Sequence, residues 1–206
     1  MKKLIFAFFL SAIALFSFTK TTHALNGMDV SEFQGNIDFS LVAKDNIEVV
    51  YIRSSASSSY IDAKFERNYK YARENNLKIG FYHYVTARTI AEAEEQARFF
   101  ASVVSGKQVD CPLAMDFEVF TGLTKEETNA ISRTFLETLE KVTGKKTIVY
   151  SDASNARYTF DSYISSNYPL WIAQYGVEEP QIAAWPEWHG WQYTDRGRVS
   201  GINGNV

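Results

Sequence analysis

The feature that most constrains the fold is a repeated switch between two hydrophobic periods. Short apolar or alternating segments, typical of strands, are followed by segments whose apolar residues recur every three or four positions, as in helices. Five such strand–helix pairs succeed one another from Gly27 onward. This alternation predicts an α/β fold with a parallel sheet and right-handed helical crossovers.

The expected strands cover residues 27–30, 48–55, 78–85, 113–120, 146–151, 170–175 and 190–194. The expected helices lie near 39–45, 64–76, 90–105, 124–144 and 154–165. Helical patterns stop at about residue 170, which favours a barrel with a helix-poor last third over an open doubly wound sheet. No glycine-rich phosphate loop follows the first strand, which also weakens a dinucleotide-binding interpretation.

The first 24 residues have the pattern of a signal peptide. Lys2 and Lys3 precede an uncharged apolar run over 4–18, and the small residues Thr22 and Ala24 suit a signal peptidase. The apolar run is short for a membrane span of roughly 20 residues. We therefore expect residues 1–24 to be removed, leaving 25–206 as one domain, secreted or associated with the cell wall, without a membrane segment.

The charge balance limits the partners. The chain has 21 basic and 24 acidic side chains, a net charge of −3, and the expected leader removes lysines but no acids. Without a basic tract, nucleic acid is not the expected partner. Cys111 is the only cysteine, and the three histidines form no cluster with metal-ligand spacing. We expect a monomer without a metal or cofactor.

Two acids stand where the fourth strand should end, in Leu113-Ala-Met-Asp-Phe-Glu118. Alternation along a strand would put Asp116 and Glu118 on one face, with α-carbons about 6.6 Å apart and Phe117 pointing away. Two carboxyl groups so close resist ionising together, so one keeps a proton near neutrality. A protonated acid beside an ionised one is what glycoside cleavage requires. The alternative is a pair of solvated or lysine-paired loop acids.

Asp29 closes the first expected strand, at the corresponding end of the barrel, where catalytic groups of such barrels emerge. Its alternative role is a turn cap before Ser31. Flat aromatic faces pack against sugar rings, although most aromatic side chains belong to cores. The aromatic candidates near strand ends or late loops are Tyr82, Tyr84, Tyr150, Trp171, Trp185, Trp188, Trp191 and Tyr193.

In motif order and spacing the chain resembles the family 25 glycoside hydrolases, the Chalaropsis-type lysozymes, from about residue 27 to 206. The motifs are Gly27-Met-Asp-Val-Ser with Gln34-Gly35, Tyr60-x-Asp62-x-x-Phe65-x-x-Asn68, Gly80-Phe-Tyr-His-Tyr84, Met115-Asp-Phe-Glu118, Pro169-Leu-Trp-Ile-Ala173 and Trp188-x-x-Trp191-Gln-Tyr-Thr194. Each motif is weak alone, but together they are specific.

The resemblance implies a flattened, TIM-like β/α barrel of five β/α units plus three strands. It also implies cleavage of the β-1,4 bond between N-acetylmuramic acid and N-acetylglucosamine in peptidoglycan glycan strands. Glu118 would be the general acid, Asp116 its stabilising or orienting partner, and Asp29 a supporting acid. The implied substrate contacts are Tyr82, Tyr150, Trp171 and Gln192.

The chain departs from the family pattern at two places. It has Arg53-Ser-Ser-Ala-Ser where relatives often carry an acid, and it stops at Val206, where the pattern continues with an aspartate and the close of the last strand. We therefore expect a truncated last strand, an open barrel edge and a site short of one acid; Asp195 does not match the missing position.

Two main functions follow from these observations. The first is an active peptidoglycan hydrolase, which the Asp116/Glu118 pair favours. The second is a catalytically impaired protein that binds cell-wall glycan, which the missing end favours. An exported hydrolase of another chemistry is less consistent with the sequence, because no Gly-x-Ser-x-Gly motif is present.

Overall fold

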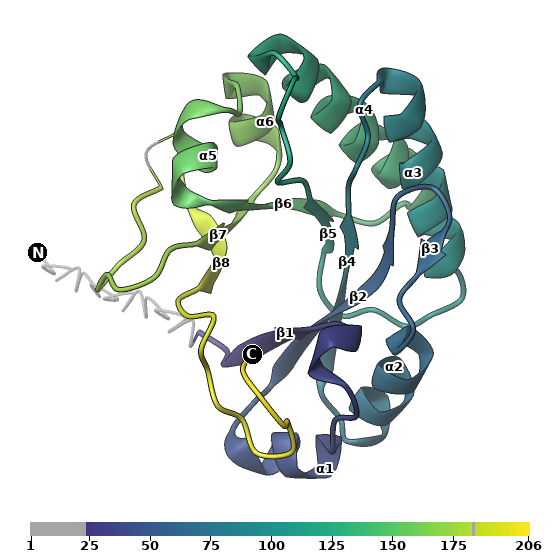
Figure 1. The fold of residues 1–206 in the computed structure, drawn as a ribbon, viewed down its shortest axis with the longest axis vertical. Helices are drawn as coiled ribbons and strands as arrows, with labels where there is room; N and C mark the ends of the chain where they lie inside the picture. Colours follow the sequence, from purple (N-terminus) through teal and green to yellow (C-terminus); the bar gives the residue numbers. More distant parts are fainter. Residues whose placement is uncertain (1–23, 183) are drawn as a thin grey trace, which may run out of the picture.

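Seven parallel strands form a nearly closed, barrel-like sheet in the computed structural model, which describes residues 24–182 and 184–206 (Figure 1). In spatial order they are β1 (Gly27–Val30), β2 (Val49–Ala56), β4 (Lys78–Tyr84), β5 (Leu113–Asp116), β6 (Thr147–Asp152), β7 (Leu170–Ala173) and β8 (Trp188–Gln192). The short strand β3 (Tyr60–Ile61) pairs antiparallel with β2. The expected signal peptide, up to residue 23, lies outside the described residues.

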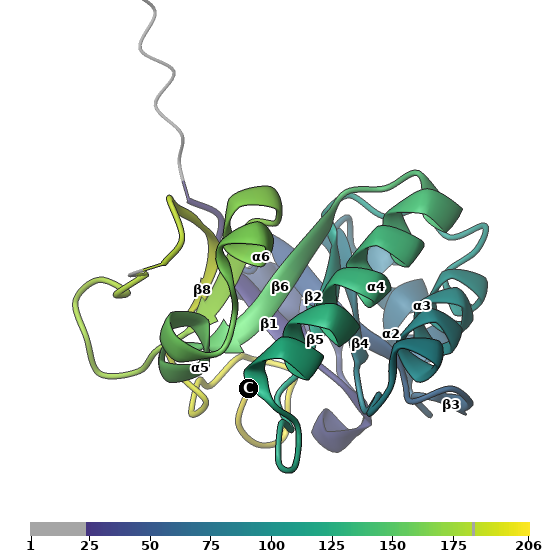
Figure 2. The ribbon, with the colours of Figure 1, turned by 90° about the horizontal axis from the view of Figure 1, so that it is seen from above.

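The helices lie on the outside of the sheet (Figures 1 and 2). They are α1 (Phe39–Val42), α2 (Phe65–Glu74), α3 (Ile90–Val103), α4 (Lys125–Thr143), α5 (Ala153–Tyr158) and α6 (Ser162–Asn167), with 3-10 turns η1 (Glu32–Gln34) and η2 (Ala43–Asp45). The capping box of Thr124 and Glu127 opens α4, and Gly144 ends it in the left-handed conformation, as the sequence predicts.

The alternation of strand and helix is confirmed, and it produces five β/α units. Two parallel strands, β7 and β8, follow the fifth unit in the described part of the chain, where the resemblance implies three. The expected helix at 154–165 is two helices, because Asp161 accepts a hydrogen bond from the Ile164 amide and so starts α6 anew.

The fourth expected strand is too long. The strand β5 ends at Asp116 and not at residue 120, because its neighbour β4 ends at Tyr84, the register partner of Asp116. The chain then turns, Phe117 enters the core at 1% exposure, and Glu118 becomes exposed.

The two faces of the sheet are packed differently. The outer face carries aliphatic and phenylalanine side chains that form the main core with the helices. The inner face holds a separate aromatic cluster around Trp171, and its rings need space that two glycines provide. A Cβ atom at Gly80 would lie 2.3 Å from the Tyr51 ring, and one at Gly190 would lie 3.1 Å from Trp171. These close approaches explain glycine inside two strands.

The sheet has a seam between its first and last strands. The hydrogen-bonded order runs from β1 to β8, with no ladder between these two strands among the described residues. The segment after β8 turns back beside β1 and α1 (Figure 1). It is held there by hydrogen bonds from the Asp38 amide to the Gly201 carbonyl, 2.9 Å, and from the Ser200 amide to Asp45, 2.8 Å.

Candidate active site

The structure brings Asp29, Asp116 and Glu118 to the carboxyl end of the barrel. Asp29 lies on β1, Asp116 is the last residue of β5, and Glu118 follows two residues later. Asp116 is 7% exposed, whereas Glu118 is exposed and Asp29 is partly exposed. The buried acid thus lies next to an acid that a substrate can reach. This is the edge at which barrel enzymes place their reactive groups.

The two acids of the Asp-x-Glu segment both have raised pKa values. Burial raises the pKa of Asp116 well above its ordinary value, and the charge and hydrogen bonding of Glu118 raise it further. Burial also raises the pKa of Glu118, while its hydrogen bond to Asp116 opposes the increase. Since burial makes both carboxyl groups resist ionisation and the charge of Glu118 raises the cost of charge on Asp116, we expect the pair to hold one proton near neutrality.

A fourth acid contributes to the same field. Asp152 ends β6 and caps α5 by accepting hydrogen bonds from the Ser154 and Asn155 amides at 2.8 and 3.0 Å. Its negative charge, together with that of Asp29, raises the pKa of Glu118. The sequence analysis missed Asp152. It could have been identified as a candidate from its place directly after the strand expected at 146–151.

Three of the expected contact residues form the aromatic interior of the barrel. Trp171 is 8% exposed, and its ring centroid lies 4.9 Å from that of Tyr150 and 6.4 Å from that of Tyr82. Asp116, Tyr150 and Trp171 are register partners on successive strands. The rings therefore support the acids from within the barrel and exclude water from one side of Asp116.

Gln192 is also at the site, but its amide is occupied by protein groups. Its Nε2 donates to Asp29 Oδ2 at 2.8 Å. Its Oε1 accepts from the hydroxyls of Tyr150, at 2.9 Å, and Tyr175, at 2.6 Å. Gln192 thus makes three hydrogen bonds within the protein, which the sequence-based expectation of a substrate contact did not include.

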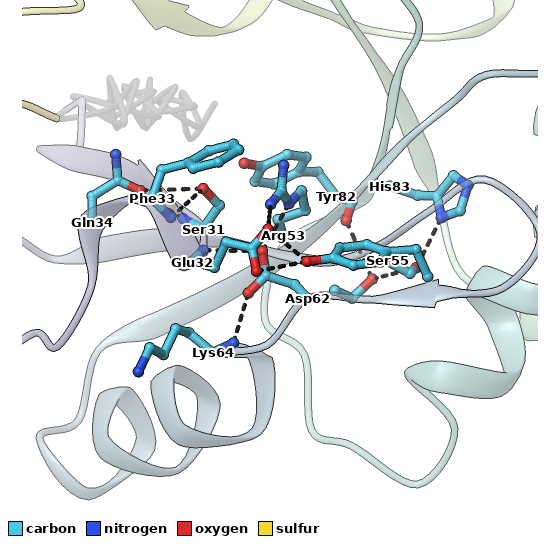
Figure 3. Close-up of polar contacts among 12 residues, drawn as sticks. Ser31, Glu32, Phe33, Gln34, Arg53, Ser55, Asp62, Lys64, Tyr82 and His83 are labelled. Atoms are coloured by element: carbon cyan, nitrogen blue, oxygen red, sulfur yellow. Dashed lines mark hydrogen bonds and ion pairs between the residues drawn. The ribbon is translucent and has the colours of Figure 1, made fainter.

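Arg53, at the start of the segment Arg53-Ser-Ser-Ala-Ser, belongs to an ion-pair network at the same end of the barrel (Figure 3). Its guanidinium binds Asp62 at 2.8 Å and Glu32 at 2.9 Å, and it lies 4.8 Å from the centre of the exposed Phe33 ring. Tyr60 donates to Glu32 at 2.6 Å. The positive charge lowers the pKa of Asp116, against the larger effect of burial.

Of the other aromatic candidates, Tyr84 lies beside the acids, because it is the register partner of Asp116, and burial and the charges of Glu118 and Asp116 raise its pKa. Trp185 is buried and donates to the Tyr168 carbonyl, and Trp191 donates to the Gln174 carbonyl, both at 2.8 Å. Trp188 begins β8, at the opposite end of the strand from Gln192. These tryptophans thus lie in β8 or just before it, near a strand end or in a late loop as expected, and two of them have hydrogen-bond partners within the protein.

In the described ranges, no group of three or more His, Cys, Asp or Glu side chains has the arrangement of a metal site. No helix in those ranges is both long and apolar enough to span a bilayer.

Comparison with known proteins places these observations in a family. The model for glycosyl hydrolases family 25 matches residues 28–202. An autolytic lysozyme of Clostridium acetobutylicum is 35% identical over 182 residues, which are 88% of this chain and 54% of that protein. The chain thus spans about half the length of that relative.

Solved structures agree. The crystal structure of a bacterial lysozyme from Streptomyces coelicolor has a TM-score of 0.80 at 29% identity, covering 90% of both chains. A family 25 glycosyl hydrolase from Bacillus anthracis has a TM-score of 0.77 at 26% identity, covering 88% of this chain and 84% of that one.

Proposed function

Because the chain belongs to glycosyl hydrolase family 25, we propose that it is a peptidoglycan hydrolase of the muramidase type. It would cleave the β-1,4 bond between N-acetylmuramic acid and N-acetylglucosamine. The single observation that carries the proposal is the Asp116/Glu118 pair, in which a buried acid and an exposed acid lie two residues apart at the carboxyl end of the barrel, both with raised pKa values.

The geometry supports a different role for each acid. Glu118 is exposed, so it gives the shared proton to the leaving glycosidic oxygen. Asp116 remains behind as a carboxylate, placed to orient the N-acetyl group of the substrate or to stabilise positive charge at the sugar. Asp29 adds negative charge beside both. Tyr82, Tyr150 and Trp171 provide the aromatic surface against which the sugar is positioned.

The protein would meet this substrate outside the cell. The basic start and apolar run of residues 1–24 support export and removal of that segment, and peptidoglycan is an extracellular polymer. We propose that residues 25–206 act as a monomer, secreted or associated with the wall.

Kinetics with Glu118→Gln test the proposal. The substitution removes the donated proton but keeps the size of the side chain, so kcat on peptidoglycan should fall by about 10²–10⁴-fold. Sedimentation with insoluble peptidoglycan should show that the variant still binds. The matched control is Glu95→Gln, at an exposed acid on α3, which should leave kcat unchanged.

A wall-binding protein without catalytic activity would behave differently. Wild type, Glu118→Gln and Glu95→Gln would then sediment alike, and none would release reducing ends. That result from folded protein would reject the hydrolase and leave the glycan-binding function.

A further inference from the structure

The side chain of Gln192 lies at the seam of the barrel, where the part of the chain that the structure describes has no backbone ladder between β8 and β1. The Gln192 main chain belongs to β8: it is the register partner of Ala173, and its carbonyl accepts from the Gln174 amide at 3.1 Å. Its side chain crosses to Asp29 on β1, a contact between residues 163 positions apart in the sequence. This amide therefore links the two edge strands by a side-chain hydrogen bond.

The orientation of the amide is fixed by two tyrosines. A glutamine carbonyl oxygen has two lone pairs, and both are used here, by the hydroxyls of Tyr150 and Tyr175. Burial raises the pKa of both phenols, so both keep the protons that they donate. With Oε1 so occupied, the NH₂ group must face Asp29. An NH₂ donor favours an acceptor oxygen, and thus the ionised form of Asp29.

Asp29 depends on this donor because burial disfavours its charge. Burial raises the pKa of Asp29, and the hydrogen bond from Gln192 is the side-chain contact that opposes the increase. The titratable groups around Asp29 whose pKa its charge raises are Tyr82, Asp116, Glu118, Tyr150 and Tyr175. The charge on Asp29 thus reaches the catalytic pair.

We propose that Gln192 is a positioning residue, which ties β8 to β1 across the seam and holds Asp29 as a carboxylate facing the Asp116/Glu118 pair, and that Tyr150 and Tyr175 fix its orientation. Gln192 is then not a substrate contact. The inference rests on the proposed hydrolase activity for its kinetic consequences, but not for its structural ones.

The first test needs no activity. Carboxyl carbon NMR of the purified protein, with the Asp29 signal assigned by Asp29→Asn, would follow the titration of Asp29 in wild type and in Gln192→Met. Methionine has a similar volume but offers no N–H donor. Asp29 should titrate at higher pH in the variant. An unchanged titration in a variant that unfolds like wild type would overturn the proposal, whether or not the protein cleaves peptidoglycan.

The second test uses kinetics. In Gln192→Met, kcat should fall about 10- to 100-fold, as for a misplaced catalytic group, while KM stays within about twofold. In Gln192→Glu, a second carboxyl group faces Asp29, and the acid limb of the pH profile should move to higher pH. Tyr175→Phe should act in the same direction but less strongly. The control, Tyr158→Phe on α5, changes a 66% exposed ring and should have no effect.

The kinetic outcomes separate the two roles of Gln192. A raised KM with unchanged kcat and pH profile would make Gln192 a substrate contact and contradict the proposal. If wild type itself proves inactive on peptidoglycan, the proposed function fails, and the NMR titration alone decides the role of Gln192.

Discussion

At the scale of single residues, the site works through unequal environments for similar groups. Asp116 and Glu118 are both carboxylic acids two positions apart, yet one is buried and the other exposed. Burial distinguishes the two acids, because it raises the cost of charge on Asp116 and leaves Glu118 within reach of a substrate. Since the pKa of Asp116 is the more strongly raised, the proton of the pair must pass from Asp116 to Glu118 before Glu118 donates it to the glycosidic oxygen. The sequence showed the pair but could not show which member is buried, since the strand ends at Asp116 and not beyond it.

The effect of Asp152 on Glu118 gives a prediction about pH. Its negative charge raises the pKa of Glu118, so Asp152→Asn should lower that pKa. As the pH is raised, Glu118 would then lose its proton at a lower pH than in wild type. The alkaline limb of the kcat/KM profile should therefore move to lower pH. Asparagine still caps α5, so the thermal midpoint should change little. A profile that keeps its alkaline limb would mean that Asp152 does not influence the proton donor.

At the scale of elements, the sequence predicted much of the architecture. The helix α4 could be predicted from the sequence because its capping box and terminal glycine are local signals, and β1 has the predicted bounds. The contacts of Gln192 and Arg53 could not be predicted from the sequence. Each joins strands or loops that are distant in sequence, so their partners depend on how the sheet closes and not on any local pattern.

The strand β4 provides a packing prediction. Gly80→Ala would place its Cβ 2.3 Å from the Tyr51 ring, and overpacking of this kind costs about 1–3 kcal/mol of unfolding free energy. The cost should shrink when Tyr51→Val makes room. Urea unfolding of the two single variants and the double variant measures this coupling. Additive effects would show that the cost of Gly80→Ala does not come from the Tyr51 ring.

A further prediction concerns the ion pair between Arg53 on β2 and Asp62, which directly follows β3. Asp62 has a fully buried side chain paired with Arg53, so Arg53→Met would leave its charge without the guanidinium. Breaking a buried pair on one side costs about 3–5 kcal/mol. Chemical denaturation should show a loss of this order, and the double variant Arg53→Met/Asp62→Asn should recover part of it. A single variant as stable as wild type would contradict a structural role for this pair.

At the scale of the whole molecule, one histidine should make stability depend on pH. His83 is fully buried between Phe100 and Phe135, and burial lowers its pKa from 6.5 to about 3. The unfolded chain therefore binds a proton below pH 6.5 that the folded protein does not. Stability from this group is complete above that pH and is lost as pH falls toward 3.

The corresponding measurement is the unfolding free energy of wild type and His83→Gln from pH 7 to pH 5. Wild type should lose about 2 kcal/mol more than the variant over this interval, because glutamine does not titrate. Equal losses in the two proteins would show that His83 is protonated in the folded state or does not control the acid sensitivity.

The central claim is that the Asp116/Glu118 pair cleaves one specific bond of peptidoglycan. Mass spectrometry of the soluble fragments released from purified peptidoglycan tests it most directly, with wild type and Glu118→Gln compared at equal concentration. The account predicts fragments that end in reducing N-acetylmuramic acid with wild type and none with the variant. Fragments ending in reducing N-acetylglucosamine, or the same fragments from both proteins, would contradict it.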